Sequence, residues 1–214
     1  MNTTMSPVYQ GQFGEFTITD ADRREVILYR TGLAIAGLSL AIGVGLILGI
    51  GNDPLVLKLL TPLFMLFSAG LGLSLWTIHI YFKVLHRVLQ LFWLVGSISA
   101  VVFTVYSAEP LAVFVYQQPF SILGVGFVFA ALTGIFFKEG FCFGRLETKL
   151  LTPLLPVLLL GHMFSFLPVS IEQAMLVAWA GLFLVFAFRK VIQAIPPDIG
   201  DKSVFEHLAK QKTA

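Results

Sequence analysis

Charged residues are scarce in this chain, and long stretches contain none. Only 12% of the 214 residues are Asp, Glu, Lys or Arg, and 57% are apolar, whereas soluble domains carry roughly 25% charged residues. Six stretches lack all four charged types: residues 31–52, 59–82, 88–108, 110–137, 150–171 and 173–188. A soluble protein of this size would have to expose that apolar surface to water. The scarcity of charge therefore excludes a soluble globular protein.

Several other features are also missing. The single cysteine, Cys142, excludes an internal disulfide, and the net charge of +2 gives no indication of nucleic-acid binding. No nucleophile–base pair, metal-binding His motif or phosphate-binding Gly-rich loop is present. Residues 31–52 are also too long for the apolar region of a signal peptide. We therefore expect no enzymatic activity and no metal site, and no cofactor is required by the sequence.

The lengths of the uncharged stretches predict helices. A helix needs ~20 apolar residues to cross the hydrocarbon core, whereas a membrane β-strand alternates apolar and polar residues over ~10 positions. We expect an all-α, polytopic membrane helix bundle with six transmembrane helices in residues 31–188. Residues 1–30 would form a cytoplasmic tail and the start of the first helix, where Thr19 and Asp22 predict a capping box. Residues 189–214 would form a second cytoplasmic tail with a short amphipathic helix that includes Phe205.

Positive charges are confined to alternate gaps between these stretches. Of the 14 Lys and Arg residues, only Lys58 lies in the first, third or fifth gap. Cytoplasmic loops carry an excess of Lys and Arg. We therefore expect both termini on the cytoplasmic side and the lipid bilayer as the surroundings of the six spans.

Small residues recur at four-residue spacing in two of the expected spans. They are Gly37, Ala41, Gly45 and Gly49 in the first, and Gly126, Ala130 and Gly134 in the fourth. Small residues on one face let membrane helices approach closely. The two ladders predict helix packing inside the molecule, with a homodimer interface as the alternative.

Two histidines are the weak candidates for cofactor binding. At 1.5 Å per residue, His79 would lie ~6 Å below the cytoplasmic surface and His162 ~20 Å below it, which argues against one haem shared by both. We expect His79 to make an interfacial hydrogen bond and His162 a buried interhelical one. Proton transfer, or axial ligation of a haem or chlorophyll by a single His, is the alternative. No Asp or Glu lies inside the expected spans, which argues against the hypothesis of ion-driven transport.

The gap between the fourth and fifth spans combines four Phe with alternating charges. We expect this segment, FFKEGFCFGRLETK, to lie on the membrane surface with its rings towards lipid. Glu139 and Glu147 would form a local ion-pair set with Arg145. The candidate interaction surface consists of Phe141, Phe143, Arg145, Glu147 and, from the C-terminal tail, Phe205.

The hexapeptide KLLTPL occurs twice, at residues 58–63 and 149–154. Each copy opens the second helix of a three-helix half, and two such halves would have opposite orientations in the membrane, as in transporters built from inverted repeats. The alternative is simple helix-start chemistry, because Thr is a good N-cap and Pro suits the first helical position.

Three segments carry a resemblance to a known family. They read QGQFGEFTITDADRREVILYR, FFKEGFCFGRLETKLLTPLLPVLLLGH and IPPDIGDKSVFEHL. With them the chain resembles an uncharacterised family of integral membrane proteins from cyanobacteria, with relatives in chloroplasts. The resemblance implies a thylakoid or plasma membrane of a cyanobacterium, and it implies no catalytic residues.

These features together favour a non-enzymatic membrane protein that assists or supports a photosynthetic membrane complex through its cytoplasmic surface. Its partners would be other membrane proteins or a second copy of the chain. A small-solute transporter or channel built on a 3+3 inverted repeat is one alternative. A protein that binds a pigment or haem through His162 or His79 is another.

Overall fold

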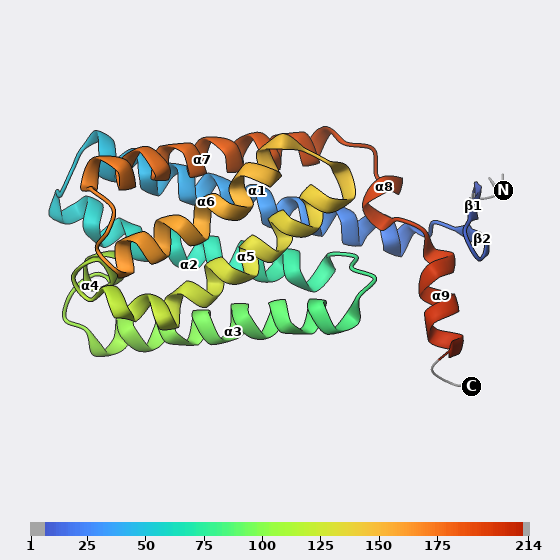
Figure 1. Cartoon of the computed structure of the whole chain (residues 1–214), viewed down its shortest axis with the longest axis horizontal. Helices are drawn as coiled ribbons and strands as arrows, with labels where there is room; N and C mark the ends of the chain where they lie inside the picture. Colours follow the sequence, from blue (N-terminus) through green and yellow to red (C-terminus); the bar gives the residue numbers. More distant parts are fainter. Residues whose placement is uncertain (1–6, 212–214) are drawn as a thin grey trace.

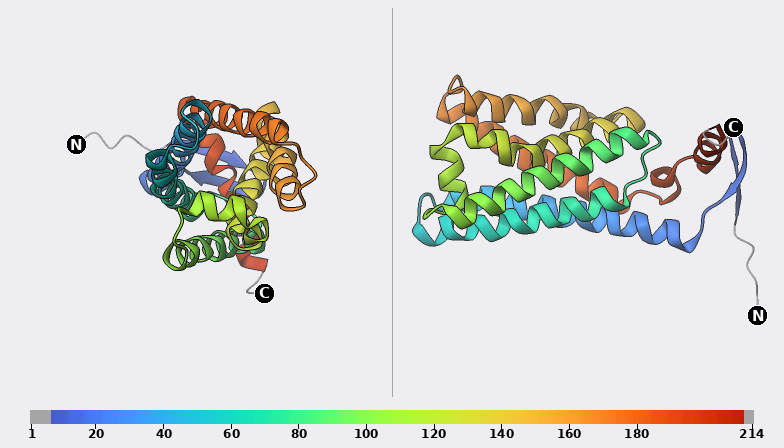
Figure 2. Two further views of the ribbon diagram at one scale, coloured as in Figure 1. Left: turned by 90° about the vertical axis from the view of Figure 1, so that its left-hand side faces the viewer. Right: turned by 90° about the horizontal axis from the view of Figure 1, so that it is seen from below.

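The computed structural model describes residues 7–211, which form mainly long antiparallel helices (Figure 1). The long helices are α1 (Asp20–Gly49), α2 (Pro54–Thr77), α3 (Lys83–Tyr106), α5 (Ile122–Phe143), α6 (Leu146–Met163) and α7 (Val169–Ile192). Each packs on the next in chain order, and α7 returns to pack on α1. The long helices therefore form a closed ring, which is visible in the end-on view of Figure 2.

Five helical segments in residues 7–211 are long and apolar enough to cross a membrane. They are α1, α2, α3, α7 and the segment Pro119–Phe143, which includes α5. α6 is outside this set: it has 18 residues, with Glu147 and Lys149 near its start and two prolines inside. It nevertheless packs against both α5 and α7. The prediction of a helical membrane bundle is confirmed, whereas six crossings and cytoplasmic termini stay predictions.

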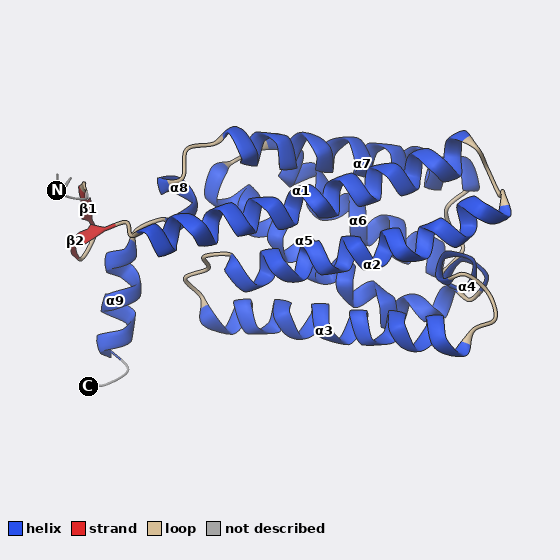
Figure 3. Cartoon of the chain, turned by 180° about the vertical axis from the view of Figure 1, so that it is seen from behind, coloured by secondary structure: helices blue, strands red, loops and turns tan. Residues whose placement is uncertain are grey.

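Short elements lie at the two ends of this bundle. The hairpin of β1 (Val8–Gly11) and β2 (Gly14–Thr17), together with α8 (Pro196–Ile199) and α9 (Lys202–Gln211), lies at one end, here called the α9 end (Figures 1 and 3). The sequence did not predict this hairpin. Asp201 joins it to α9 by accepting hydrogen bonds from the backbone N–H groups of Gln12 (2.6 Å) and Ser203 (2.9 Å). At the opposite end, here called the α4 end, lie α4 (Leu111–Gln117) and the 3-10 turn η1 (Pro119–Ser121).

Local capping chemistry sets the helix starts. The capping box of Thr19 and Asp22 is present at the start of α1, so that prediction is confirmed. α2 begins at Pro54 because Asp53 Oδ1 accepts a hydrogen bond from the Leu55 N–H (2.8 Å). The first KLLTPL copy, residues 58–63, therefore lies inside α2. The second, residues 149–154, lies inside α6, which begins at Leu146, so the prediction that the copies open helices is wrong. The Thr61 hydroxyl instead accepts a hydrogen bond from the Leu111 N–H of α4 (3.1 Å).

The Phe-rich segment is part of a tight helical hairpin and does not form a surface loop. α5 continues to Phe143, Gly144 follows in the left-handed conformation (φ 63°), and α6 begins at Leu146. Glycine adopts this conformation without the steric cost of a side chain. Phe136 and Glu139 are fully buried as a result. The prediction of a segment lying on the bilayer with Glu139 at its surface is wrong, because the helix extends past the first charges.

Helix backbones approach most closely at glycines outside the expected ladders. Gly32 of α1 faces the backbone of Gly70 of α2, and Gly96 of α3 faces the backbone of Val128 of α5. Of the first ladder, Gly37 faces Ala187 of α7 at ordinary contact distance and Ala41 is half-buried, while Gly45 and Gly49 are exposed with open space beside them. Of the second, Gly126 faces only Ile122 of its own helix, Ala130 is half-buried, and Gly134 faces the side chain of Leu89. Helix packing inside the molecule thus uses only part of each ladder.

Candidate functional site

A cavity of about 1230 Å³ lies within the ring of helices, towards the α4 end. α1, α2, α4, α5, α6 and α7 line it with mostly apolar side chains. Its walls include Gly51 and Asn52 of the α1–α2 connection and Gln117 at the end of α4, so the cavity reaches the α4 end of the bundle. Small-molecule sites in proteins are typically apolar cavities of ~300–1,000 Å³ with a few polar groups that orient the ligand. The lining of this cavity matches such a site, and its volume lies above the upper end of that range.

Three buried polar atoms with no hydrogen-bond partner in the described chain belong to residues that line this cavity. They are Ser39 Oγ of α1, His162 Nε2 of α6 and Trp179 Nε1 of α7. At 1.5 Å per residue, Ser39 and Trp179 each lie ~15 Å from the α4-end terminus of their helix. Leaving a buried polar group unpaired costs ~1–3 kcal/mol. Ser39, His162 and Trp179 are therefore the lining residues whose side chains have unused hydrogen-bonding capacity.

His162 lies at the mouth of the cavity. Its Nδ1 is 2.9 Å from Glu172 Oε1, in the first turn of α7, and its ring packs on Tyr116 of α4 with the centroids 4.9 Å apart. A carboxylate only accepts hydrogen bonds, so we assign the proton to Nδ1. Nε2 is then the ring nitrogen without a partner in the described chain, Trp179 Nε1 is a donor, and the Ser39 hydroxyl can donate or accept. The cavity is complementary to a ligand with an apolar body and a few hydrogen-bonding groups.

His162 lies near the end of its helix, and its depth in a membrane stays a prediction. α6 ends at Met163, only one residue later, and the backbone turns at Ser165 with a positive φ of 56°. The uncharged stretch 150–171 therefore includes a turn as well as a helix. The expected interhelical hydrogen bond is present, but its partner Glu172 lies at the edge of the bundle.

The α9 end of the ring is closed by a cluster of buried ion pairs. Lys190 of α7 is fully buried and pairs with Glu139 of α5 (2.9 Å) and with Asp198 of α8. Asp198 also pairs with Arg30 of α1 (2.6 Å), and Tyr29 donates a hydrogen bond to Glu139 (2.9 Å). We call these five residues the ion-pair cluster. It links three ring helices to α8 at the end opposite the cavity mouth.

Residues 73–207 match the family described as uncharacterised integral membrane proteins, DUF2301. The chain belongs to this family. The matched region runs from the end of α2 to within α9, so it includes His162, Trp179 and the cluster residues Glu139, Lys190 and Asp198. No curated protein and no solved structure matches the chain. The DUF2301 assignment confirms an integral membrane protein of an uncharacterised family and adds no activity.

The residues of the candidate interaction surface do not form one continuous surface in this DUF2301 protein. Arg145 contacts Gln193, and Glu147 pairs with Arg189 (3.0 Å), so the expected Glu139–Arg145–Glu147 set is wrong. Phe143 lies under Lys190, whose Nζ is 4.4 Å from the ring centroid, and Phe205 packs on Tyr81 with centroids 4.6 Å apart. Phe141 alone among the three Phe is strongly exposed, at 84%.

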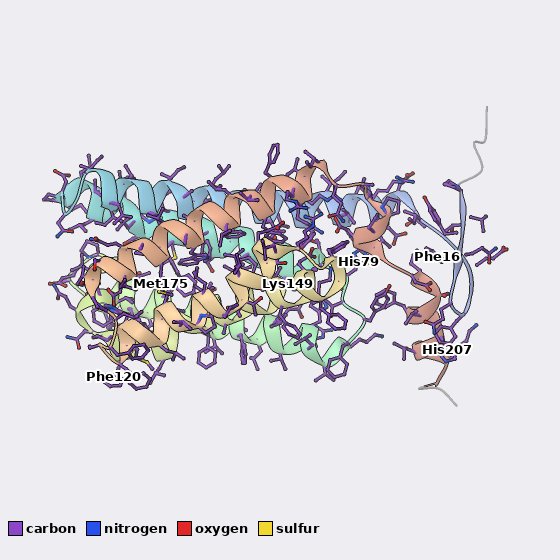
Figure 4. All side chains as sticks on the ribbon, turned by 45° about the horizontal axis from the view of Figure 1, so that its top comes forward. Phe16, His79, Phe120, Lys149, Met175 and His207 are labelled. Carbon is purple, nitrogen blue, oxygen red and sulfur yellow. The ribbon has the colours of Figure 1, made fainter. Side chains whose placement is uncertain are left out.

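His79 of the DUF2301 protein lies at the α9 end, in the connection from α2 to α3 (Figure 4). Its Nε2 is 3.2 Å from Glu25 Oε2 of α1. Burial lowers the pKa of His79, and the nearby Glu25 carboxylate opposes that shift. His79 and His162 thus lie at opposite ends of the bundle. Among the described residues, no group of three His, Cys, Asp or Glu side chains is arranged to hold a metal ion.

Sequence reasoning missed the ion-pair cluster. Arg30, Glu139 and Lys190 each lie beside the end of an uncharged stretch, where charged side chains ordinarily reach the membrane surface. Two signals were available in the sequence. Positive and negative residues both occur next to the uncharged stretches on one side of the bundle, and Asp198 directly follows the Pro196–Pro197 pair. Nothing in the sequence paired these residues with one another.

Proposed function

We propose that this DUF2301 protein binds a small amphipathic solute in the central cavity and carries it across the membrane. The observation that carries the proposal is the set of three unpaired buried polar atoms, on Ser39, His162 and Trp179, at a mostly apolar cavity. The solute class follows from this lining: an apolar body with a few groups that hydrogen-bond to Ser39, His162 or Trp179.

The position of the ion-pair cluster supports transport in addition to binding. The cavity reaches the α4 end, while buried charges on α1, α5, α7 and α8 close the α9 end. A central site accessible from one side only is the arrangement expected of an alternating-access transporter. The order of the helices around the ring is compatible with a 3+3 inverted repeat. If α1, α2 and α3 are exchanged with α5, α6 and α7, each pair of neighbouring helices becomes another pair of neighbours.

The test is mass spectrometry of small molecules that co-purify with the gently solubilised protein. We expect one amphipathic species in the wild type, and about five- to tenfold lower occupancy in Ser39→Leu and in Trp179→Phe, because each loses a hydrogen bond to the solute. Tyr106→Phe is the control, since Tyr106 is exposed on α3 and lies outside the cavity. The species found is then tested for uptake into liposomes that contain the protein. Equal occupancy in all variants would refute the site, and binding without uptake would refute transport.

Assembly or support of a photosynthetic complex is the second candidate function. It is favoured by the exposed Phe141 at the α5–α6 hairpin and by the ordered unit of β1, β2, α8 and α9 at the same end. Affinity purification of the tagged protein from cyanobacterial thylakoid and plasma membranes tests both the function and the proposed location. A stoichiometric protein partner that is lost in Phe141→Ser would replace transport as the leading function.

An absorption spectrum of the same preparation distinguishes the solute from a pigment. His162 Nε2 is the nitrogen that a haem or chlorophyll would use, because Nδ1 is occupied by Glu172. A visible band that disappears in His162→Ala would assign the cavity to a pigment.

A further inference from the structure

A second crevice, of about 430 Å³, lies at the α9 end where α2 connects to α3. Its lining is basic and contains His79, Lys83, His86 and Arg87. Trp76 of α2 stands beside them with 78% of its surface exposed. Among the described residues, no Asp or Glu lines this crevice.

The start of α3 adds to the positive potential of this crevice. The helix has 24 residues, and in the structure no side chain caps its N-terminus and no acidic residue lies in its first turn. A helix N-terminus carries roughly half a positive charge, which acidic side chains normally offset. Here the first residue is Lys83 and Arg87 follows one turn later. An electropositive helix end with added cations is stabilised by a bound anion.

The two cations of the crevice are not neutralised within the described chain. Neither Lys83 nor Arg87 takes part in any of its ion pairs. The Glu25 carboxylate lies 3.2 Å from His79 Nε2, on the His79 side of the crevice lining. His86 is held in place because its Nε2 lies 2.6 Å from the Leu75 carbonyl oxygen. Arg87 Nη1 donates a hydrogen bond to Gln90 Oε1 (3.3 Å), a neutral lining residue. The crevice therefore presents two exposed cations that have no carboxylate partner in the described chain.

We propose that this crevice binds the tetrahedral oxyanion of an anionic lipid headgroup. The site lies where one candidate membrane helix ends at Thr77 and the next begins at Lys83, which is the depth of the headgroups. The exposed Trp76 and Val84 would flank the acyl chains, and Trp favours this interfacial depth. Basic pockets between membrane helices recognise anionic headgroups in this way.

The test is native mass spectrometry of the full-length protein in detergent with dioleoylphosphatidylglycerol or dioleoylphosphatidylcholine. We expect the wild type to retain phosphatidylglycerol preferentially. Lys83→Gln and Arg87→Gln should each weaken that preference about fivefold, as expected for one basic residue near an anionic headgroup. Lys149→Gln is the matched control, because Lys149 is exposed on α6 and does not line the crevice. It should change the preference less than twofold.

Two outcomes would overturn the proposal. Equal losses in Lys83→Gln, Arg87→Gln and Lys149→Gln would show general attraction to surface charge and no specific site. Displacement of phosphatidylglycerol by an equimolar amount of inorganic phosphate would assign the crevice to a soluble anion. Melting temperatures of the three variants within a few degrees of the wild type show that any loss reflects binding and not unfolding.

Discussion

Lys190→Met is expected to destabilise the DUF2301 protein by about 3–5 kcal/mol, the usual cost of removing one partner from a buried ion pair. Lys190 is fully buried and bonds to both Glu139 and Asp198. Met fills a similar volume without a charge. The two carboxylates would then remain away from water with Lys138, Tyr29, Arg30 and Gln193 as partners. Reversible unfolding in mixed detergent and SDS micelles, followed by circular dichroism, measures the change.

Two further variants separate the charge from the side-chain volume. Lys149→Met makes the same chemical change at an exposed position of α6 and should alter the free energy of unfolding by less than about 1 kcal/mol. Lys190→Met combined with Glu139→Gln should recover part of the loss, because it removes one of the two uncompensated carboxylates. If Lys190→Met and Lys149→Met have equal effects, Lys190 is not part of a buried ion-pair cluster.

Gly32→Ala is expected to destabilise the protein by about 2–3 kcal/mol, at the upper part of the range for overpacking. A Cβ atom at Gly32 would overlap the Gly70 carbonyl oxygen and the Ser74 hydroxyl of α2. The backbone of α2 can relieve the overlap only by moving away from α1. That movement would also break the hydrogen bond that Ser74 donates to the Tyr29 carbonyl oxygen (2.9 Å). The same unfolding measurement applies.

Gly45→Ala provides the matched control, on the same helix. Nothing lies within 4 Å of a Cβ atom at Gly45, and Ala has a higher helix propensity than Gly by up to ~1 kcal/mol. The substitution should leave stability unchanged or raise it. Equal destabilisation by both variants would contradict the close contact between α1 and α2.

The features that the sequence predicted correctly are those determined locally. The uncharged stretches predicted the membrane helices because the hydrophobic requirement of a span acts on each segment separately. Thr19 and Asp22 predicted the start of α1 because both members of a capping box lie within one turn. The Asp53–Pro54 pair at the start of α2 carries an equally local signal. The Thr61–Pro62 pair farther along the chain is also typical of a helix start, and it led to the wrong prediction that α2 begins there.

The candidate site could not be predicted in the same way. Arg30 and Asp198 are 168 positions apart in the chain, and only the closed ring brings them together. The cavity depends on six helices at once, so no single stretch carries its pattern. The end of α6 directly after His162 was not predicted, because the apolar turn that follows has the same composition as a span. The hydrophobicity of a segment indicates whether it is stable in lipid, but it does not indicate where a helix ends and the backbone turns.

The contact between α7 and α1 has a consequence for biosynthesis. The ribosome makes α1 first and α7 last among the long helices, yet these two lie side by side in the finished ring. Until α7 enters the bilayer, the flank of α1 that it will cover must be occupied by lipid or by a chaperone. Arg30 must likewise wait for Asp198, which is synthesised after α7. The ring of helices can therefore close only after α7 has been inserted into the membrane.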